Sequence, residues 1–197
     1  KRTMPATLPH PAAQRGMLRD WTYNDYLKLD DDTRYEIING ELLLAPAPSL
    51  GHQRVSRDLQ YPFIRFTMKH KIGEVLNAPV DVILSPRVIV QPDLVFIHKD
   101  RADICKERGV FGAPDIIVEI ISPSSIARDR HSKMKLYRKY EVKEYWLVDP
   151  ANRSVEALRL NDAGGYDLHS SAVGRGRVES AVLHGLRVNI QSIFSTE

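Results

Sequence analysis

Two acidic residues stand beside or inside apolar runs, where a carboxylate is costly to bury. Asp93 leads into the run 94–97, and Glu119 lies within the run 116–121. Burial of a carboxylate is unfavourable unless the group is paired with a cation or holds a metal. A basic segment at about residues 127–140 follows these runs and can supply a lysine. This order of residues predicts a divalent-metal site of the kind that hydrolyses phosphodiesters.

Lys133 is the lysine that the helical pattern of this segment directs toward the interior. On a helix turning about 100° per residue, Lys133 lies at the centre of an apolar stripe that includes Leu136 and Tyr137. Asp129 shares that face. A lysine in a buried stripe needs a carboxylate partner or a route to solvent. Asp129 and Glu119 are both candidate partners, so a structural ion pair and a functional one remain equally open.

The predicted chemistry requires these residue types for electrostatic reasons. Two carboxylates can fix a hard cation that keeps some of its waters and coordinates a phosphate oxygen. A nearby lysine can orient the attacking water or stabilise the charge that builds on the phosphate. Asp93 and Glu119 must therefore meet in space, which neighbouring strands would allow.

Composition indicates an ordinary globular protein with one basic segment. The chain of 197 residues has a net charge of only +3, yet residues 127–143 hold seven Lys/Arg against two Asp/Glu. That local excess fits an anionic partner such as a phosphate backbone, although a solvated helix face explains it equally well. Cys105 is the only cysteine, which excludes an internal disulfide and a cysteine-based zinc site.

The length and the apolar runs predict one domain and no membrane partner. No apolar run approaches the roughly 18 residues that span a bilayer. Residues 1–20 are rich in Pro and Ala and are expected to form a flexible lead-in, followed by a single domain over 21–197. The single cysteine suits a reducing compartment, so a cytoplasmic location is expected.

Periodicity predicts an α/β fold with a mixed sheet flanked by helices on both faces. Helices are expected at 23–29, at 52–69 (kinked or divided by Pro62) and over the basic segment. The predicted strands are 75–84, 88–97, 116–121, 144–149, 154–160, 166–171 and 186–190. The spacing of strands 116–121 and 144–149 around a helix predicts that they are parallel neighbours.

A hairpin around Asn39-Gly40 is the clearest local signal, because this pair suits a two-residue type I′ turn. Its register places Tyr35 and Ile37 on the face toward the core. Glu36 falls on the opposite face. It is either a surface residue or an acid aimed into a cleft, and the pattern alone favours the surface.

A series of short motifs in this order resembles the Uma2 family, whose members are restriction-endonuclease-like proteins of the PD-(D/E)XK nuclease superfamily. The motifs extend over about residues 21–160. They are the segment 35–42, His52, residues 91–93, residues 118–124, Asp129 with Lys133 and Tyr137, and residues 144–150.

The resemblance implies a restriction-endonuclease-like fold, a Mg²⁺ cofactor with Mn²⁺ as a substitute, DNA as substrate and a homodimer. By this analogy Asp93 and Glu119 are the metal carboxylates, and the carbonyl of Ile120 is a further ligand. Lys133 and Glu36 complete the catalytic set, and His52 and Asp129 are accessory residues. The usual superfamily lysine lies two residues after the second acid. Here Ile121 holds that place, so Lys133 must reach the site from the helix.

Three functions are compatible with these observations. The first is a Mg²⁺-dependent endodeoxyribonuclease. The second is a non-catalytic nucleic-acid-binding or dimeric scaffold of the same fold, against which the retained set of Asp93, Glu119 and Lys133 argues. The third is a metal-dependent hydrolase of a smaller phosphate ester, which the modest net charge keeps open. Fold kinship by itself does not establish activity.

Overall fold

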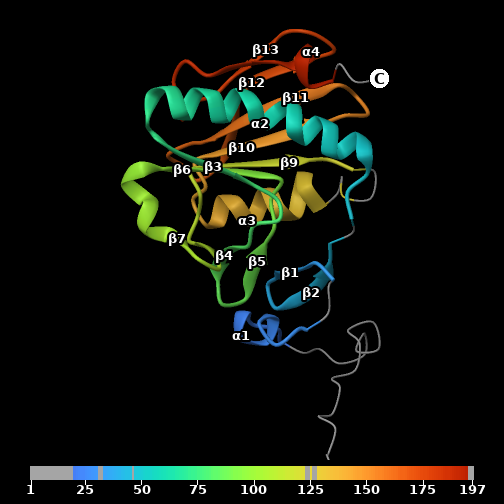
Figure 1. Cartoon of the computed structure of the whole chain (residues 1–197), viewed down its shortest axis with the longest axis vertical. Helices are drawn as coiled ribbons and strands as arrows, with labels where there is room; N and C mark the ends of the chain where they lie inside the picture. Colours follow the sequence, from blue (N-terminus) through green and yellow to red (C-terminus); the bar gives the residue numbers. More distant parts are fainter. Residues whose placement is uncertain (1–19, 31–32, 46, 123–124, 126–127, 195–197) are drawn as a thin grey trace, which may run out of the picture.

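The structure is a computed structural model that describes residues 20–30, 33–45, 47–122, 125 and 128–194. Except for Asp20, the predicted lead-in over residues 1–20 lies outside the described residues. The single domain over 21–197 stays a prediction. Within the described part, two six-stranded sheets and a two-stranded ribbon are packed together with helices (Figure 1).

The larger layer is a central sheet with the strand order β12-β11-β10-β9-β6-β3. As predicted, β9 and β10 are parallel neighbours, and every other pair in this sheet is antiparallel. All residues of β9 and β10 are buried, which explains their near-continuous apolar sequence. The strands are β3 (Gly73–Asn77), β6 (Leu94–His98), β9 (Ile116–Ile120), β10 (Glu144–Asp149), β11 (Ser154–Leu160) and β12 (Tyr166–Val173).

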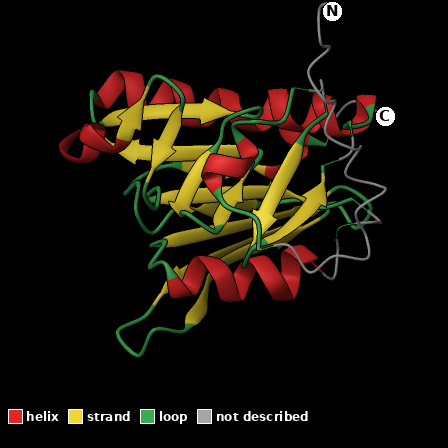
Figure 2. Cartoon of the chain, turned by 90° about the horizontal axis from the view of Figure 1, so that it is seen from below, coloured by secondary structure: helices red, strands yellow, loops and turns green. Residues whose placement is uncertain are grey.

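Helices cover both faces of the central sheet, as predicted. On one face, α2 (Leu50–His70) buries Leu59 and Phe63 in the same cluster as Trp146. On the other face, α3 (Met134–Lys139) buries Tyr137 in a cluster that includes Tyr145. This separation follows from the alternation of side chains along β10. Figure 2 shows the strands lying between the helical segments.

The second sheet has the order β2-β1-β5-β4-β8-β7 and contains the predicted hairpin. Asn39 and Gly40 both have positive φ, 53° and 84°, as a type I′ turn requires, and Tyr35 pairs with Leu44. The strands are β1 (Tyr35–Ile38), β2 (Glu41–Leu44), β4 (Val82–Ser85), β5 (Val88–Val90), β7 (Cys105–Lys106) and β8 (Gly109–Phe111).

The residue ranges predicted for two strands were wrong. The strand expected at 75–84 is divided into β3 and β4, and the strand expected at 88–97 into β5 and β6; in each case the two halves belong to different sheets. Pro79 and Pro92 lie at the two crossings. Because proline has no N–H for the ladder, pairing stops there and the chain can pass from one sheet to the other.

The remaining elements differ from expectation in detail. Helix α2 is not divided at Pro62, and the basic segment begins as a π-helix, η3 (Arg128–Lys133), before α3. The strand expected near 186–190 is β14, which pairs with β13. The other elements are α1 (Tyr23–Tyr26), η2 (Lys99–Ile104), β13 (Arg177–Glu179), β14 (Arg187–Asn189) and α4 (Ile190–Ile193). No helix in the described ranges is both long and apolar enough to cross a membrane.

Asp115 fixes the start of β9. Its side chain is buried and accepts hydrogen bonds from the His98 N–H at 2.8 Å, Arg101 at 3.0 Å and Lys143 at 2.7 Å. Burial opposes the charge of this carboxyl, but the His98 N–H and the two cations outweigh burial and lower the pKa of Asp115 below its usual value. Asp115 therefore joins β6, η2 and the loop before β10 at the entry to the central sheet.

We expect Asp115→Asn to destabilise the protein by about 1–3 kcal/mol, because a buried hydrogen-bond network loses its charged acceptor. Since the folded pKa is lowered, this contribution is fully present above the unfolded pKa of about 3.9 and is lost as the pH falls below it. Urea unfolding of both proteins between pH 3 and 7 measures the difference. The exposed neighbour Asp100, changed to Asn, serves as the control; an equal loss there, or a difference independent of pH, would contradict this role.

Candidate functional site

The strand register brings Asp93 and Glu119 to the same end of the central sheet. Leu94 of β6 pairs with Val118 of β9 in an antiparallel ladder. Asp93 precedes Leu94 and Glu119 follows Val118, so the next step of this register sets the two acids opposite each other on one face. The sequence prediction that neighbouring strands bring these acids together is therefore borne out by the pairing of β6 with β9.

Glu119 is the buried acid at the centre of the site. Its Oε1 accepts hydrogen bonds from Lys133 Nζ at 2.9 Å and from Tyr137 Oη at 2.6 Å. Burial raises the pKa of Glu119 to about 8, because the stabilising charge of Lys133 is offset by the neighbouring acids Asp129, Asp93 and Glu36. Burial and the three neighbouring acids together outweigh Lys133, so Glu119 takes up a proton more readily than an exposed glutamate does.

Lys133 lies on the inward face of its helical segment, as the spacing of the apolar residues predicted, and is only 4% exposed. Its Nζ is 2.9 Å from Oε1 of both Glu119 and Glu36, whereas Asp129 Oδ1 is 4.0 Å away. Of the two partners considered, Glu119 is therefore the closer. Burial alone would lower the pKa of Lys133, but Glu119 and Glu36 raise it above its ordinary value. The ammonium group is charged.

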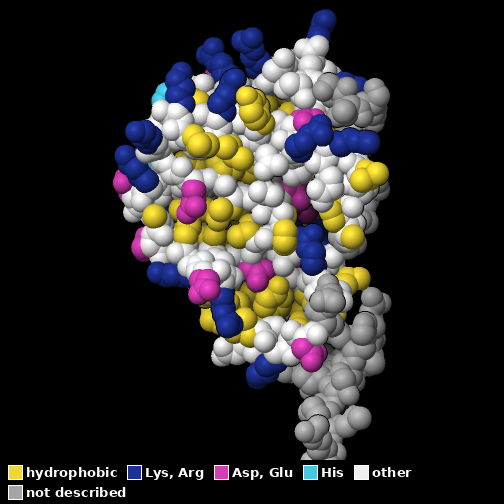
Figure 3. Space-filling model, viewed as in Figure 1, with side chains coloured by type: hydrophobic (Ala, Val, Ile, Leu, Met, Phe, Trp, Pro, Cys, Tyr) yellow, Lys and Arg dark blue, Asp and Glu magenta, His cyan; other side chains and the backbone are white. Residues whose placement is uncertain are grey.

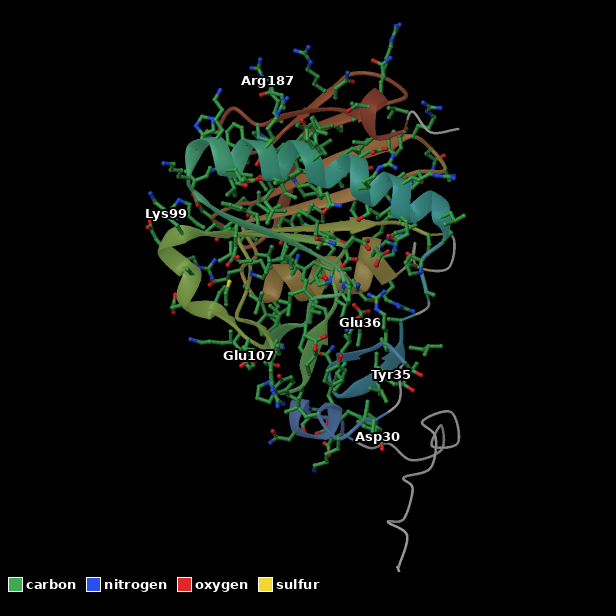
Figure 4. All side chains as sticks on the ribbon, viewed as in Figure 1. Asp30, Tyr35, Glu36, Lys99, Glu107 and Arg187 are labelled. Carbon is green, nitrogen blue, oxygen red and sulfur yellow. The ribbon has the colours of Figure 1, made fainter. Side chains whose placement is uncertain are left out.

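Glu36 is buried, so the surface position that the hairpin pattern favoured was wrong. It is 3% exposed, and its Oε1 accepts a hydrogen bond from the Gln91 N–H at 2.9 Å. Burial works against the charge of Glu36, but Lys133 and the Gln91 N–H outweigh it and lower the pKa. The hairpin pattern missed this because both faces of β1 are covered: Ile38, on the same face as Glu36, packs in the cluster that includes Tyr137. Figure 4 shows Glu36 on the α3 side of β1.

Asp93 and His52 form the more open side of the site. Asp93 Oδ1 lies 2.8 Å from His52 Nε2, and Oδ2 accepts a hydrogen bond from the Ile120 N–H at 2.6 Å. The two side chains are 18% and 16% exposed for His52 and Asp93. His52 is placed here because Ser49 caps α2 and accepts a hydrogen bond from the His52 N–H. The structure therefore places His52 against Asp93, at a partly exposed edge of the site.

Asp129 and Arg128 complete the charged surroundings. Asp129 is buried, and burial raises its pKa even though Lys133 stabilises the charged form. Arg128 Nη1 lies 3.9 Å from Glu36 Oε2. Neither a role for Arg128 nor the contact of the Tyr137 hydroxyl with Glu119 was predicted from the sequence. The i,i+4 spacing of Tyr137 from Lys133 was the available signal for that contact.

The donor set fits a hard divalent cation better than a soft one. Four acids, Asp93, Glu119, Glu36 and Asp129, outnumber the two cations Lys133 and Arg128, and carboxylate oxygens are the ligands that Mg²⁺ and Mn²⁺ prefer. Within the described ranges, no three His, Cys, Asp or Glu side chains are grouped closely enough to hold an ion by themselves. A cation here would therefore draw on two carboxylates, a backbone carbonyl and water.

The comparisons with known proteins support one family. Among solved structures, the chain resembles a protein from Anabaena variabilis ATCC 29413 titled as a putative nuclease belonging to DUF820: TM-score 0.71, 18% identity, covering 88% of this chain and 97% of that one. This likeness shows the fold. The type IIG restriction endonuclease BpuSI matches with a TM-score of 0.42 and 13% identity, over 77% of this chain and 17% of that one. No curated protein matches the chain.

The family comparison covers most of the sequence. A model of the Uma2 family, with the description "Putative restriction endonuclease", matches residues 23–191. This range contains β1, the two acids on the central sheet and the helix that carries Lys133. The chain belongs to the Uma2 family.

Proposed function

We propose that this protein is a Mg²⁺-dependent nuclease that hydrolyses phosphodiester bonds in DNA. The description of the Uma2 family supports a nuclease. The observation that carries the proposal is the buried Lys133 ammonium, 2.9 Å from both Glu119 and Glu36, on the sheet end where Asp93 and Glu119 face each other. This set combines acids for a hard cation with a charged amine for the phosphate.

In this proposal Asp93, Glu119 and the Ile120 carbonyl hold the Mg²⁺, for which Mn²⁺ can substitute. The bound ion supplies charge neutralisation at a phosphate oxygen and a water of lowered pKa. Lys133 orients the attacking water or stabilises the charge that builds on the phosphate. Glu36 keeps the ammonium charged and in place, and His52 fixes the orientation of Asp93. Tyr137 holds Glu119 through the 2.6 Å hydrogen bond to its Oε1.

One observation favours a second function, a non-catalytic nucleic-acid-binding or dimeric scaffold of the same fold. Both oxygens of Asp93 and Oε1 of Glu119 already contact protein groups, so the cluster could serve as a closed structural network. The two functions differ in whether the cluster takes up a metal ion. The homodimer and the cytoplasmic location remain predictions.

Asp93→Asn is expected to reduce cleavage of plasmid and duplex oligonucleotides at least about 100-fold, because a neutral amide is a poorer ligand for a hard cation. The measurement is the rate of strand scission in Mg²⁺ and in Mn²⁺, compared with the wild type. Asp162→Asn, an exposed acid in the turn after β11, is the matched control and should cleave as the wild type does. Undiminished cleavage by Asp93→Asn would show that the site is misassigned.

The wild-type protein is expected to bind Mn²⁺, and Glu119→Gln to bind it at least about tenfold more weakly, because one charged ligand is lost. Electron paramagnetic resonance of free Mn²⁺ measures binding without requiring activity. Tyr137→Phe, which removes the hydroxyl bound to Glu119 but no charge, should retain binding. Equal, weak binding by all three proteins, together with no cleavage by the wild type, would favour the scaffold.

Lys133→Met is expected to lower the free energy of unfolding by about 3–5 kcal/mol, because two buried carboxylates lose their common cation. The double variant Lys133→Met, Glu36→Gln should recover part of this loss, since one of the unpaired charges is removed. Urea denaturation of the metal-free proteins measures both effects. A single variant as stable as the wild type would mean that Lys133 does not neutralise this cluster.

A further inference from the structure

A pocket opens beside the start of α2. It lies outside the carboxylate cluster, which consists of Asp93, Glu119, Glu36 and Asp129. It has a volume of about 70 Å³ and is lined by Gly51, Arg54, Val55, Pro150, Arg153, Ile193 and Phe194. Val55, Ile193 and Phe194 are buried, so the floor of the pocket is apolar, while the two arginines are exposed at its rim. Two guanidinium groups beside one pocket are suited to an anion, because arginine forms paired, charge-assisted hydrogen bonds with oxyanions.

The two arginines of this pocket are free to bind a ligand. Among the residues that the structure describes, the guanidinium groups of Arg54 and Arg153 form no ion pair and no hydrogen bond. By contrast, Arg57, one turn further along α2, is bound to Asp58 through two hydrogen bonds of 2.7 and 2.9 Å. Arginine is the side chain best suited to phosphate, since its planar fork of donors matches the phosphate oxygens.

The position of Arg153 is fixed by the turn after β10. The Arg153 N–H donates to the Pro150 carbonyl at 3.2 Å, and the Arg153 carbonyl accepts from the Gly174 N–H at 2.8 Å. The nearby acid, Asp149, is engaged by Asn152 at 2.8 Å. A backbone held at both its N–H and its carbonyl fixes the place from which the Arg153 side chain extends at the pocket.

Both walls of the pocket continue into the carboxylate cluster. His52, which contacts Asp93, lies between Gly51 and Arg54 in the first turns of α2. Pro150 follows β10 two residues after Val148, and Val148 pairs with Ile120, the neighbour of Glu119. Figure 3 shows Lys and Arg side chains over both ends of α2. The pocket therefore lies on the same end of the central sheet as the proposed reaction site.

We infer that this pocket binds a backbone phosphate of the nucleic acid strand, next to the phosphodiester that the carboxylate cluster addresses. Arg54 and Arg153 hold the phosphate oxygens from two sides, and the pocket sets the position of the strand along the site. The inference rests on the proposed function for its substrate. It concerns binding rather than cleavage, because phosphate contacts fix the register of a nucleic acid on a protein.

Gly51 provides a test that changes no charge. A Cβ at this position would meet only Ser49 Oγ, at 3.8 Å, so packing within the protein does not require glycine here. Because Gly51 lines the pocket, a larger side chain here adds bulk at the pocket wall without displacing other residues. Because glycine is a poor helix residue, Gly51→Leu is expected to keep or improve the stability of α2.

The experiment measures binding of a fluorescent DNA duplex by anisotropy in EDTA, where Mg²⁺-dependent cleavage cannot occur, at several salt concentrations. We expect Arg54→Ala, Arg153→Asn and Gly51→Leu each to raise Kd about tenfold, and the double arginine variant to lower the salt slope by about one. Asn suits the positive φ of 46° at position 153. Arg65→Ala, the same loss of charge further along α2, is the control and should change Kd less than about threefold.

Each outcome decides the inference separately from the nuclease proposal. Weaker binding by all three pocket variants supports it even if the wild type cleaves nothing. Wild-type affinity in Gly51→Leu and Arg54→Ala, or an equal effect of Arg65→Ala, overturns it even if cleavage is robust. The inference is also overturned if inorganic phosphate binds the wild type but not the pocket variants, while the Kd for DNA is the same in all of them. The pocket would then serve a free anion. Thermal unfolding of each variant confirms that it is folded.

Discussion

The contact of the Lys133 ammonium with two buried carboxylates is the interaction on which the site depends. Glu119 comes from the central sheet, Glu36 from the second sheet, and Lys133 from the helical segment between β9 and β10. One cation thus joins three parts of the fold in surroundings where an unpaired charge would be costly. The crossing from β5 to β6 contributes twice: the Gln91 N–H binds Glu36, and Asp93, two residues later, reaches the mouth of the site.

The excess of acids over cations distinguishes this cluster from a simple ion pair. Lys133 and the more distant Arg128 face four acids, and burial, together with the three neighbouring acids, raises the pKa of Glu119 despite the charge of Lys133. A structural salt bridge would be expected to balance its charges, since imbalance lowers stability. A site that binds a divalent cation has a reason to keep the imbalance, because the ion restores neutrality. The network of protein contacts around Asp93 and Glu119 would then hold the ligands in place until the ion binds.

Local patterns in the sequence predicted the parts of the site that depend on neighbouring residues. The Asn39-Gly40 turn, the parallel pairing of β9 with β10 and the inward face of Lys133 each follow from the spacing of a few residues. Contacts between distant segments were not predictable in this way. The ion pair of Glu36 depends on Lys133 of η3, about 100 residues away, and the division of two strands between sheets depends on where Pro79 and Pro92 interrupt pairing. The pocket at Arg54 and Arg153 likewise joins segments that no local pattern connects.

Anomalous scattering from a crystal soaked in Mn²⁺ would show whether these acids bind a metal, because it locates the ion without reference to activity. We expect a peak between the carboxylates of Asp93 and Glu119, within about 2.0–2.3 Å of an oxygen from each, and no such peak in crystals of a Glu119→Gln variant. A well-diffracting soaked crystal with no peak at that position, or with manganese bound only at surface acids, would contradict it. The buried cluster would then be a structural network, and the chemistry of this fold would have to lie elsewhere.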